Sequence, residues 1–448
     1  MKLGKLKRVY FLGIGGIGMS AIAKYLHHTG VSVFGYDKTK TKLTKSLEKQ
    51  GMKIHYREDV KKIPEDIDLI VYTPAIPDEN IEKKYLLTLG IPFMKRAEVL
   101  GWITKKKKTL AIAGTHGKTT TSAILTHLLR TGDIDCTAFL GGIAVNYKSN
   151  FVAGTSKIAV VEADEYDRSF LHLSPYAAVI TSMDADHLDI YGDHEEMLDS
   201  GFRAFSKRVQ EGGTLLLQNH LKLRKPKGVV KTSYGIDAGE ARAENVYVKK
   251  GYFHFDYCAK NVQWTDLRFG LPGLHNIENA VAAISLARLV KVEEKSIRKG
   301  LASFKGIKRR FEFIVRKAHQ VYIDDYAHHP TELKASIGAA RMLYPDRKIA
   351  GIFQPHLFSR TRDFKKEFAV ALDTLDEIIL LPIYPAREMP IKGITSKTIF
   401  DLMKSKNKYV VEKKDLISFL QKREIDVLMT LGAGDIDTEI DNIKRILK

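Results

Sequence analysis

A short loop with two glycines, Gly114 and Gly117, constrains the possible fold of this chain more than any other feature. It follows the apolar run 110–113 and leads directly into Lys118 and Thr119. Backbone N–H groups of such a loop can surround phosphate oxygens, a lysine neutralises terminal phosphates, and a threonine hydroxyl can hold Mg²⁺. The segment therefore predicts a strand, a phosphate-binding loop and a helix in an α/β sheet. The candidate nucleotide-binding residues are Gly114, Thr115, His116, Gly117, Lys118, Thr119 and Thr120.

The loop departs from the common phosphate-loop pattern at one position. That pattern has a glycine five residues before Gly117. This chain has Ile112 there, so the loop is a variant of the pattern.

A second glycine loop lies near the start of the chain. Residues 13–18 follow the strand-like run Arg8–Leu12 and open a helix, and Asp37 ends the next strand-like run. These are the local elements of the dinucleotide-binding fingerprint, in which a pyrophosphate lies at a helix N-terminus. NAD(P) and a UDP-sugar both carry a pyrophosphate, so the motif alone leaves both ligands open, and the second phosphate loop disfavours NAD(P). The candidate contact residues are Gly13, Gly15, Gly16, Ile17, Gly18 and Asp37.

A chain of 448 residues is too long for a single hydrophobic core. Strand-like runs alternate with helix-like segments along it, which is typical of parallel α/β architecture. A lysine-rich joint at 105–108 precedes the phosphate-loop strand, and the alternation restarts near 306–310. We therefore expect three α/β domains, at residues 1–105, 106–307 and 308–448.

The composition says more about where the protein works than about which reaction it performs. The chain has 72 Lys and Arg against 53 Asp and Glu, a formal net charge of +19. A solvated basic surface explains this charge, with nucleic-acid binding and the steering of nucleotides as alternatives. No zinc knuckle or recognition-helix pattern accompanies the charge, so we expect no nucleic-acid partner. The two cysteines, Cys136 and Cys258, lack metal-ligand spacing, and no run approaches the ~18 apolar residues of a membrane span. We expect a cytoplasmic protein without a disulfide.

Two polar clusters follow strand-like runs. Glu162 ends the run that begins at residue 158, and a carboxylate at a strand end beside a phosphate loop commonly holds Mg²⁺. A solvated acidic turn is the alternative. The second cluster, residues 184–189, contains His187. Because Mg²⁺ prefers oxygen ligands, three roles stay possible for His187: a metal ligand, a group that orients a ligand, or an acid or base.

Together and in this order, the motifs resemble those of the Mur ligase family of cell-wall synthesis. The resemblance covers the whole chain, at residues 13–19, 114–120, 162–167, 186–189, 271–276, 279, 306–312, 324–332 and 353–363. It implies an N-terminal Rossmann-like domain for a UDP-sugar, a central P-loop ATPase-like α/β domain with a mixed sheet, and a C-terminal Rossmann-like domain that closes over both. Ile112 agrees with the family's own variant of the phosphate loop.

The resemblance also implies which residues bind ATP and Mg²⁺. Lys118 would contact the β- and γ-phosphates, and Thr119 would hold the first Mg²⁺. Glu162 and His187 would hold the Mg²⁺ nearer the γ-phosphate. The residues assigned to the adenine pocket are His275, Asn276 and Asn279. A helix N-cap is the alternative role for Asn276.

The implied reaction is ATP-driven formation of an amide. A carboxylate attacks the γ-phosphate to give an acyl phosphate and ADP, and an amine then displaces the phosphate. Phosphoryl transfer depends mainly on positioning and charge neutralisation, so Lys118, Mg²⁺ and an arginine would share the charge. Arg309 and Arg310 are the arginine candidates, and an interdomain salt bridge is the alternative for each.

The segment 324–332 brings carboxylates, imidazoles and a phenol to one loop, which suits an ammonium group and its proton. The candidates there are Asp325, Tyr326 and His328. The neighbouring His329 precedes Pro330, and a His-Pro pair can instead order the start of a helix. Arg360 and Arg362 are candidates for the carboxylate of the amino acid, with a basic surface helix as the alternative.

A missing lysine favours one branch of the family. Relatives that add later amino acids carry a carbamylated lysine shortly after the segment that matches 186–189, and residues 188–202 contain none. This agrees with the branch that joins L-alanine to UDP-N-acetylmuramate with ATP as co-substrate and Mg²⁺ as cofactor. A peptide-recycling ligase for the same sugar nucleotide, an NAD(P)-dependent oxidoreductase and a non-catalytic UDP-sugar-binding regulator are the alternatives. The oligomeric state stays open.

Overall fold

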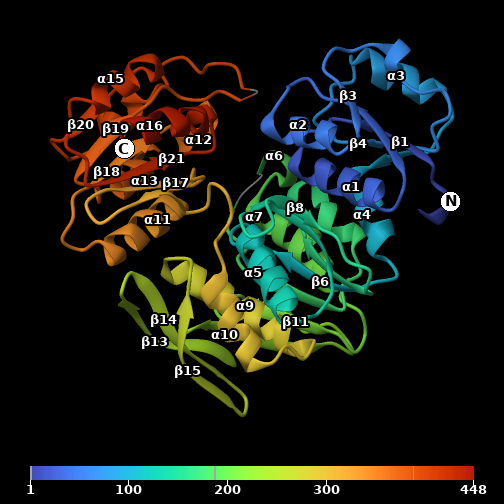
Figure 1. Cartoon of the computed structure of the whole chain (residues 1–448), viewed down its shortest axis with the longest axis horizontal. Coiled ribbons are helices and arrows are strands. Elements are labelled where there is room, and N and C mark those ends of the chain that lie inside the picture. The colour runs from blue at the N-terminus through green and yellow to red at the C-terminus, as the bar shows by residue number, and fades with distance from the viewer. Residues whose placement is uncertain (1–2, 186–187, 387, 448) are drawn as a thin grey trace. The chain divides into compact units, whose positions relative to one another are not determined.

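The computed structural model describes residues 3–185, 188–386 and 388–447. The chain divides into two compact units, whose helices and strands are shown in Figure 1. The first unit consists of Met1–Glu244, Tyr257–Thr265 and Glu278–Ser303. The second consists of Asn245–Asp256, Asp266–Ile277 and Phe304–Lys448.

The amino-terminal part of the first unit is a parallel sheet with the strand order β3-β2-β1-β4-β5. This order places β1 at the centre, as in a Rossmann fold. Its apolar residues 9–12 are fully buried, which is typical of parallel strands. The strands are β1 (Arg8–Leu12), β2 (Ser32–Tyr36), β3 (Lys53–His55), β4 (Leu69–Tyr72) and β5 (Phe93–Lys95), and the helices are α1 (Ile17–His28), α2 (Lys42–Lys49), α3 (Ile81–Thr88) and α4 (Arg96–Thr104).

The phosphate-loop strand β6 lies inside a mixed sheet with the order β15-β14-β13-β12-β11-β10-β6-β9-β7-β8. β10 and β9 flank β6 in parallel, so the loops after these strands open at the same edge. The strands are β6 (Lys108–Ala113), β7 (Thr137–Ala144), β8 (Ser149–Val152), β9 (Ile158–Glu162), β10 (Ala177–Ile180), β11 (Thr214–Gln218), β12 (Val230–Ile236), β13 (Ala241–Lys249), β14 (Tyr252–Ala259) and β15 (Val262–Phe269). The helices are α5 (Lys118–Thr131), α6 (Leu188–Tyr191), α7 (His194–Glu196), α8 (Ala204–Ser206), α9 (Leu274–Leu289) and α10 (Glu294–Ser303).

The second unit contains a sheet with the order β16-β17-β21-β18-β19-β20, in which β16 alone of these strands pairs in the antiparallel sense. All residues of β17 are buried, including two aspartates at its carboxyl end. The strands are β16 (Glu312–Arg316), β17 (Val321–Asp325), β18 (Ile349–Phe353), β19 (Glu377–Leu380), β20 (Lys408–Val410) and β21 (Val427–Leu431). The helices are α11 (Pro330–Leu343), α12 (Phe358–Asp363), α13 (Lys365–Leu372), α14 (Lys397–Phe400), α15 (Leu416–Leu420) and α16 (Ile440–Ile446).

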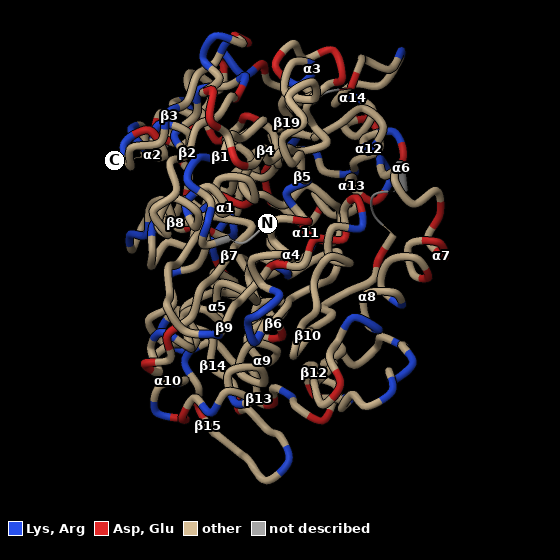
Figure 2. Tube along the Cα trace, turned by 90° about the vertical axis from the view of Figure 1, so that its right-hand side faces the viewer, with Lys and Arg blue, Asp and Glu red and all other residues tan. Residues whose placement is uncertain are grey.

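Lys and Arg are interspersed with Asp and Glu along the chain (Figure 2). Several form exposed or half-exposed ion pairs, such as Arg341 with Asp376. In the part of the chain that the structure describes, no helix has both the length and the apolar character that crossing a bilayer requires.

His127 is a buried titratable residue in the middle of α5. Its Nδ1 lies 3.1 Å from the Tyr147 hydroxyl, and its Nε2 lies 2.9 Å from the Ser303 hydroxyl. Burial lowers the pKa of His127 from 6.5 to about 4, so its ring is neutral at pH 7.

This pKa predicts a specific loss of stability in acid. The unfolded chain protonates His127 near pH 6.5 and the folded chain only near pH 4, so stability falls as the pH drops between these values. The loss at low pH amounts to roughly 3 kcal/mol, at about 1.4 kcal/mol per pKa unit. We expect His127→Gln to flatten the dependence of the urea unfolding midpoint on pH between 6.5 and 4. His319→Gln, at an exposed position, is the control and should leave that dependence unchanged. A His127→Gln protein with the wild-type dependence would contradict the assignment.

Candidate active site

The first glycine loop joins β1 to α1. Gly13 has a φ of 85°, a left-handed conformation that favours glycine. The Gly15 N–H donates to the Asp37 carboxylate at 2.7 Å, and a Cβ on Gly15 would lie 2.7 Å from the same oxygen. The helix N-cap, Gly16, makes no side-chain capping bond. No side chain therefore covers the first turn of α1 from the N-cap position.

A cavity of about 490 Å³ connects this loop with the carboxylate cluster of the same unit. Gly13, Gly16, Ile17 and Gly18 line one part of it, with Asp37. The lining residues that sequence reasoning did not single out include Lys38, Lys95, Arg96, Phe139, Leu140 and Gly141, and the cavity also reaches Glu162, Asp164 and Asp167. One continuous space thus extends from the first glycine loop to Glu162.

The second glycine loop joins β6 to α5. Gly114 and Gly117 have φ values of 133° and 82°, and an added Cβ would lie 2.1 Å from Thr181 Oγ1 or 2.6 Å from Asn279 Oδ1, respectively. The positive φ values and these close approaches together favour glycine at both positions. Ile112, where the common pattern has glycine, is a fully buried residue of β6 and pairs with β9 and β10.

Ser182 holds the middle of this loop. Its hydroxyl accepts from the His116 N–H at 2.8 Å and lies 2.8 Å from the Thr115 hydroxyl. His116 Nε2 lies 3.6 Å from Asp184. Thr120 is nearly buried in the first turn of α5. The residues that follow β10 therefore hold the phosphate loop in this conformation.

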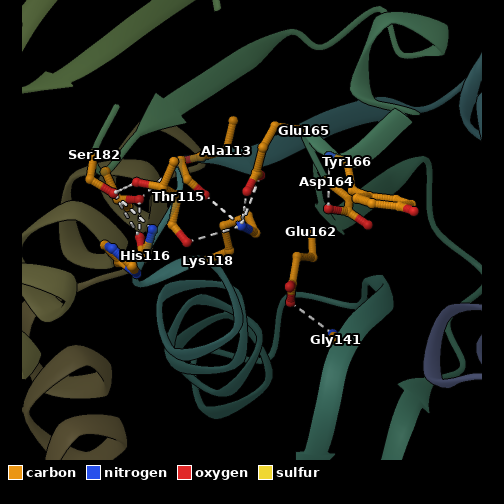
Figure 3. A network of polar contacts seen from close by, with 12 residues as sticks. Ala113, Thr115, His116, Lys118, Gly141, Glu162, Asp164, Glu165, Tyr166 and Ser182 are labelled. Atoms are coloured by element: carbon orange, nitrogen blue, oxygen red, sulfur yellow. Dashed lines mark hydrogen bonds and ion pairs between the residues drawn. The ribbon is translucent and has the colours of Figure 1, made fainter. Parts of the chain in front are cut away.

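Lys118 is the first residue of α5 and turns back toward the loop (Figure 3). Its Nζ donates to the carbonyl oxygens of Gly114 at 2.6 Å and Thr115 at 3.3 Å, and to Glu165 at 2.8 Å. Burial disfavours the charge on Lys118, but Glu165 and the nearby carboxylates outweigh it and raise the lysine pKa. The lysine is therefore a cation at the position expected for the terminal phosphates.

Glu162 ends β9, beside the start of α5. It accepts hydrogen bonds from the Thr119 hydroxyl at 2.9 Å and from the Gly141 N–H at 2.8 Å. Burial raises the pKa of Glu162, and Lys118 and the two hydrogen bonds oppose that shift. An added Cβ on Gly141 would lie 2.3 Å from both carboxylate oxygens of Glu162.

The neighbouring oxygens of Glu162 and Thr119 fit a Mg²⁺ ion. Mg²⁺ commonly takes one or two protein oxygens and completes its octahedron with water and substrate phosphates. The residues that the structure describes contain no group of three or more His, Cys, Asp and Glu suited to a metal, so a cage made only of such residues is absent there. His187, the other expected ligand, lies outside the described residues, as does Asp186.

The three adenine candidates have different surroundings. In the first unit, Asn279 is nearly buried and its Oδ1 accepts from the Thr121 hydroxyl at 3.1 Å. In the second unit, Asn276 donates from Nδ2 to the Pro272 carbonyl at 2.5 Å. α9 begins at Leu274, so the alternative N-cap role for Asn276 is wrong, because the residue already lies within the first turn. Burial lowers the pKa of His275 to about 4, and its ring is neutral at pH 7.

Arg309 and Arg310 have distinct environments in the second unit. Arg309 donates to Asp324 at 3.3 Å and to the Gly432 carbonyl at 2.7 Å. Burial raises the pKa of Asp324 to about 6, and Arg309 opposes that shift. Arg310 lies 3.7 Å from Glu332 and its side chain is more exposed. Arg309 is thus bound within its own domain, whereas Arg310 has a more open guanidinium group.

The segment after β17 brings together the expected polar side chains. Asp325 accepts from the Ser336 hydroxyl at 2.7 Å, and burial raises its pKa. His328 Nδ1 lies 3.0 Å from the Tyr326 carbonyl oxygen, and the two rings are in edge contact. His329 is the N-cap of α11, with Pro330 in the first turn. The two histidines therefore differ in their contacts: His329 caps α11, whereas His328 packs against Tyr326.

Arg360 and Arg362 both lie on α12. Arg360 Nη1 lies 3.4 Å from His356 Nδ1, and the His356 ring is in edge contact with His328. Arg362 pairs with its neighbour Asp363 at 2.7 Å, and about half of each side chain is exposed. Only the first of these arginines adjoins the histidine cluster.

Sequence reasoning missed several polar residues of the first unit. Glu165 belongs to the acidic cluster already noted, but nothing in its spacing distinguished it from its neighbours as the partner of Lys118. Arg96 pairs with Asp164 at 3.5 Å and Lys95 pairs with Asp167 at 2.9 Å. Neither basic residue belongs to a motif, so no local signal was available.

Comparisons with known proteins agree with this geometry. Three family models match: the Mur ligase family catalytic domain at residues 8–108, the Mur ligase middle domain at 112–287, and the Mur ligase glutamate ligase domain at 309–434. UDP-N-acetylmuramate–L-alanine ligase from Flavobacterium psychrophilum is 49% identical over 100% of this chain and 99% of its own length. The enzyme of the same name from Porphyromonas gingivalis is 47% identical over 99% of both chains.

Solved structures share the fold. UDP-N-acetylmuramate-alanine ligase from Thermotoga maritima aligns with a TM-score of 0.84 at 28% identity over 98% of both chains. A murein peptide ligase from Psychrobacter arcticus, at 21% identity and a TM-score of 0.71, also covers 98% of both chains and shows the fold alone. The predicted fold class, three α/β domains with a mixed central sheet, is confirmed. The chain belongs to the Mur ligase family.

Proposed function

We propose that this protein is an ATP-dependent ligase that joins L-alanine to the lactyl carboxylate of UDP-N-acetylmuramate, releasing ADP and phosphate. The observation that carries the proposal is the cavity that runs from the first glycine loop to Glu162. A pyrophosphate at the loop would direct the sugar end of the substrate along this space, toward the side of the phosphate loop. Full-length relatives with 45–49% identity bear the name of this activity.

The two glycine loops and the carboxyl-terminal cluster suggest a division of substrates. Residues 1–105 would bind the UDP-sugar through Gly13–Gly18 and Asp37. Residues 106–307 would bind ATP through the loop at 114–120, and residues 308–448 the amino acid. His275, Asn276 and Asn279 stay proposed contacts of the adenine base.

In the first step, the lactyl carboxylate would attack the γ-phosphate to form an acyl phosphate. Lys118, already a cation, would bind the β- and γ-phosphate oxygens. Thr119 and Glu162 would hold Mg²⁺, which when bound would neutralise phosphate charge; His187 is a further proposed ligand. Arg310 is the better candidate for contact with the transferred phosphoryl group, because Arg309 is engaged with Asp324 and Gly432.

In the second step, the amine of alanine would attack the acyl carbon and phosphate would leave. Asp325, Tyr326 and His328 would bind the ammonium group and take its proton. Arg360, beside His356, would bind the alanine carboxylate, with Arg362 as a weaker candidate because Asp363 already occupies it.

The alternatives fit the molecule less well. A recycling ligase shares the sugar nucleotide and differs in its amine substrate, so only turnover with different amines separates the two. An NAD(P)-dependent oxidoreductase would leave Lys118, Thr119 and Glu162 without a role. A non-catalytic UDP-sugar-binding protein would not need a charged lysine beside a carboxylate and a hydroxyl.

Turnover tests the proposed function directly. We expect purified protein with Mg²⁺, ATP and UDP-N-acetylmuramate to release ADP when L-alanine is added. Lys118→Ala should reduce this turnover at least ~100-fold, because a preorganised charge at the phosphates is lost. Release of ADP only with a tripeptide that begins with L-alanine would support the recycling ligase. Reduction of NAD(P) without ADP release would refute both ligases.

Gly141→Ala tests the position of Glu162. Gly141 does not have a positive φ, so alanine adds only a Cβ, placed 2.3 Å from the carboxylate oxygens. Glu162 must then move by about 1 Å, and a displacement of that size can cost ~100-fold in rate. We expect kcat to fall by this factor. Gly338→Ala, on α11 with nothing within 4 Å of the added Cβ, is the matched control and should keep wild-type kcat. Equal activity of both variants would exclude a precise role for Glu162.

Arg360→Ala and Arg362→Ala form a matched pair on one helix. Loss of an arginine that binds a carboxylate in a desolvated site costs about 2–5 kcal/mol. We expect Arg360→Ala to raise the KM for L-alanine at least ~30-fold, within that range. Arg362→Ala should raise it less than about fivefold, since exposed pairs contribute little. The reverse order, measured by initial rates at saturating ATP and sugar nucleotide, would assign the carboxylate to Arg362.

A further inference from the structure

Lys24 is a buried lysine on α1, the helix that follows the first glycine loop. Only 6% of the Lys24 residue surface is exposed to solvent. Its Nζ donates to Asn150 Oδ1 at 2.7 Å and to the Ser149 hydroxyl at 3.2 Å. Both acceptors are neutral oxygens, and burial lowers the pKa of Lys24 to about 8.

Asn150 connects this lysine to the beginning of the same helix. It is fully buried, and its Nδ2 donates to the Ile17 carbonyl at 2.6 Å and to the Ser20 hydroxyl at 2.9 Å. Ile17 is the first residue of α1 and lines the cavity. One amide group on β8 therefore contacts α1 at its first turn directly and at its second turn through Lys24.

β8 is paired with the strand that contacts Glu162. β7 and β8 are antiparallel, with Phe139 opposite Phe151 and Ala144 opposite Ser149, and their register shifts between these two pairs. Gly141 lies within the irregular stretch of β7 and donates to Glu162. Asn150 and Lys24 thus join the first two turns of α1 to the hairpin that carries Gly141.

Apolar packing accompanies the polar contact between the same elements. The Tyr25 ring lies 5.5 Å from Phe139 and 6.1 Å from Phe151, centroid to centroid. Such contacts are attractive, and the rings prefer tilted or edge-on arrangements. Hydrogen bonds are directional, and an unpaired buried donor is costly. The polar contact therefore adds directional restraints to the position of α1 on the hairpin.

The contact has a stability cost that an apolar residue would avoid. A buried ammonium group bonded only to neutral oxygens loses hydration without gaining an opposite charge. Methionine at residue 24 would fill similar space with an apolar chain. The buried Lys24 ammonium group is therefore better explained by the position that it gives to α1 than by any gain in stability.

We propose that Lys24 and Asn150 are positioning residues that set where the first glycine loop stands relative to Gly141 and Glu162. This inference rests on the proposed function, in which the loop binds the pyrophosphate of the sugar nucleotide and Glu162 lies beside the site of phosphoryl transfer. The attacking carboxylate oxygen must lie about 3–3.5 Å from phosphorus, and a 1 Å error can cost ~100-fold. Lys24 and Asn150 act through the loop and the hairpin and do not touch the substrate.

The test compares kcat with thermal stability. We expect Lys24→Met to lower kcat about tenfold with only a small change in its unfolding temperature, because removal of a buried charge stabilises the fold and the unpaired Asn150 oxygen destabilises it. We expect Asn150→Ala, which removes both connections, to lower kcat about 100-fold. The KM for UDP-N-acetylmuramate should change less than about threefold in both, because the loop that binds the pyrophosphate is intact. Lys24→Arg, which keeps a donor, should recover part of the rate.

Controls separate this inference from a simple loss of folding. Lys45→Met, at an exposed site on α2, should keep wild-type kcat and KM. Rates are expressed per ATP-binding site, titrated in each variant, so that unfolded protein does not count. Wild-type kcat in both Lys24→Met and Asn150→Ala would overturn the inference while leaving the proposed function intact. An inactive wild-type protein would overturn the proposed function, and this inference with it.

Discussion

The ion pair between Lys118 and Glu165 is the interaction on which the phosphate loop depends. Lys118 begins α5 after β6, and fully buried Glu165 follows β9, so the pair joins the ends of two neighbouring parallel strands. Removing one partner of a buried pair leaves an uncompensated charge and typically costs about 3–5 kcal/mol. Because the same ammonium group also binds the Gly114 and Thr115 carbonyls, one charge fixes both the loop and the acidic turn.

That acidic turn distributes its carboxylates among different partners. Glu165 pairs with Lys118, Asp164 with Arg96 and Asp167 with Lys95. Glu162 instead accepts from two neutral donors, the Thr119 hydroxyl and the Gly141 N–H. Because both hydrogen-bond donors are neutral, these two bonds bring no cation to Glu162, and its oxygens can still accept one. This difference explains why Glu162, within a cluster of similar residues, is suited to Mg²⁺.

Features that depend on residues close in the sequence were predictable. Both strand–glycine loop–helix units were expected, because glycine spacing and an apolar run determine them locally. The partner of Lys118 could not be predicted, because the sequence does not distinguish the four acidic residues in the segment 162–167. Which of them lies beside the lysine depends on how β9 pairs with β6 in the sheet. The N-cap expected as an alternative for Asn276 was wrong since α9 begins two residues earlier. Arg309 and Arg310 are adjacent in sequence, and only distant partners such as Gly432 distinguish them.

The cations of the cavity illustrate how a site can be prepared for an anion without being blocked. Lys95 and Arg96 are held by Asp167 and Asp164, at 2.9 and 3.5 Å, with side chains 20–39% exposed. Pairs of this kind contribute only about 0–1 kcal/mol, because water screens the charges. In the proposed complex, a pyrophosphate would offer more oxygens and more charge than one carboxylate, so exchange of the partner would cost little and would form a charge-assisted bond. The buried pair at Lys118 cannot be exchanged as cheaply, since its carboxylate is fully buried. Weak pairs in the cavity and a strong pair beside the phosphate loop would therefore give the proposed sugar-nucleotide site adaptable charges and the proposed ATP site a fixed one.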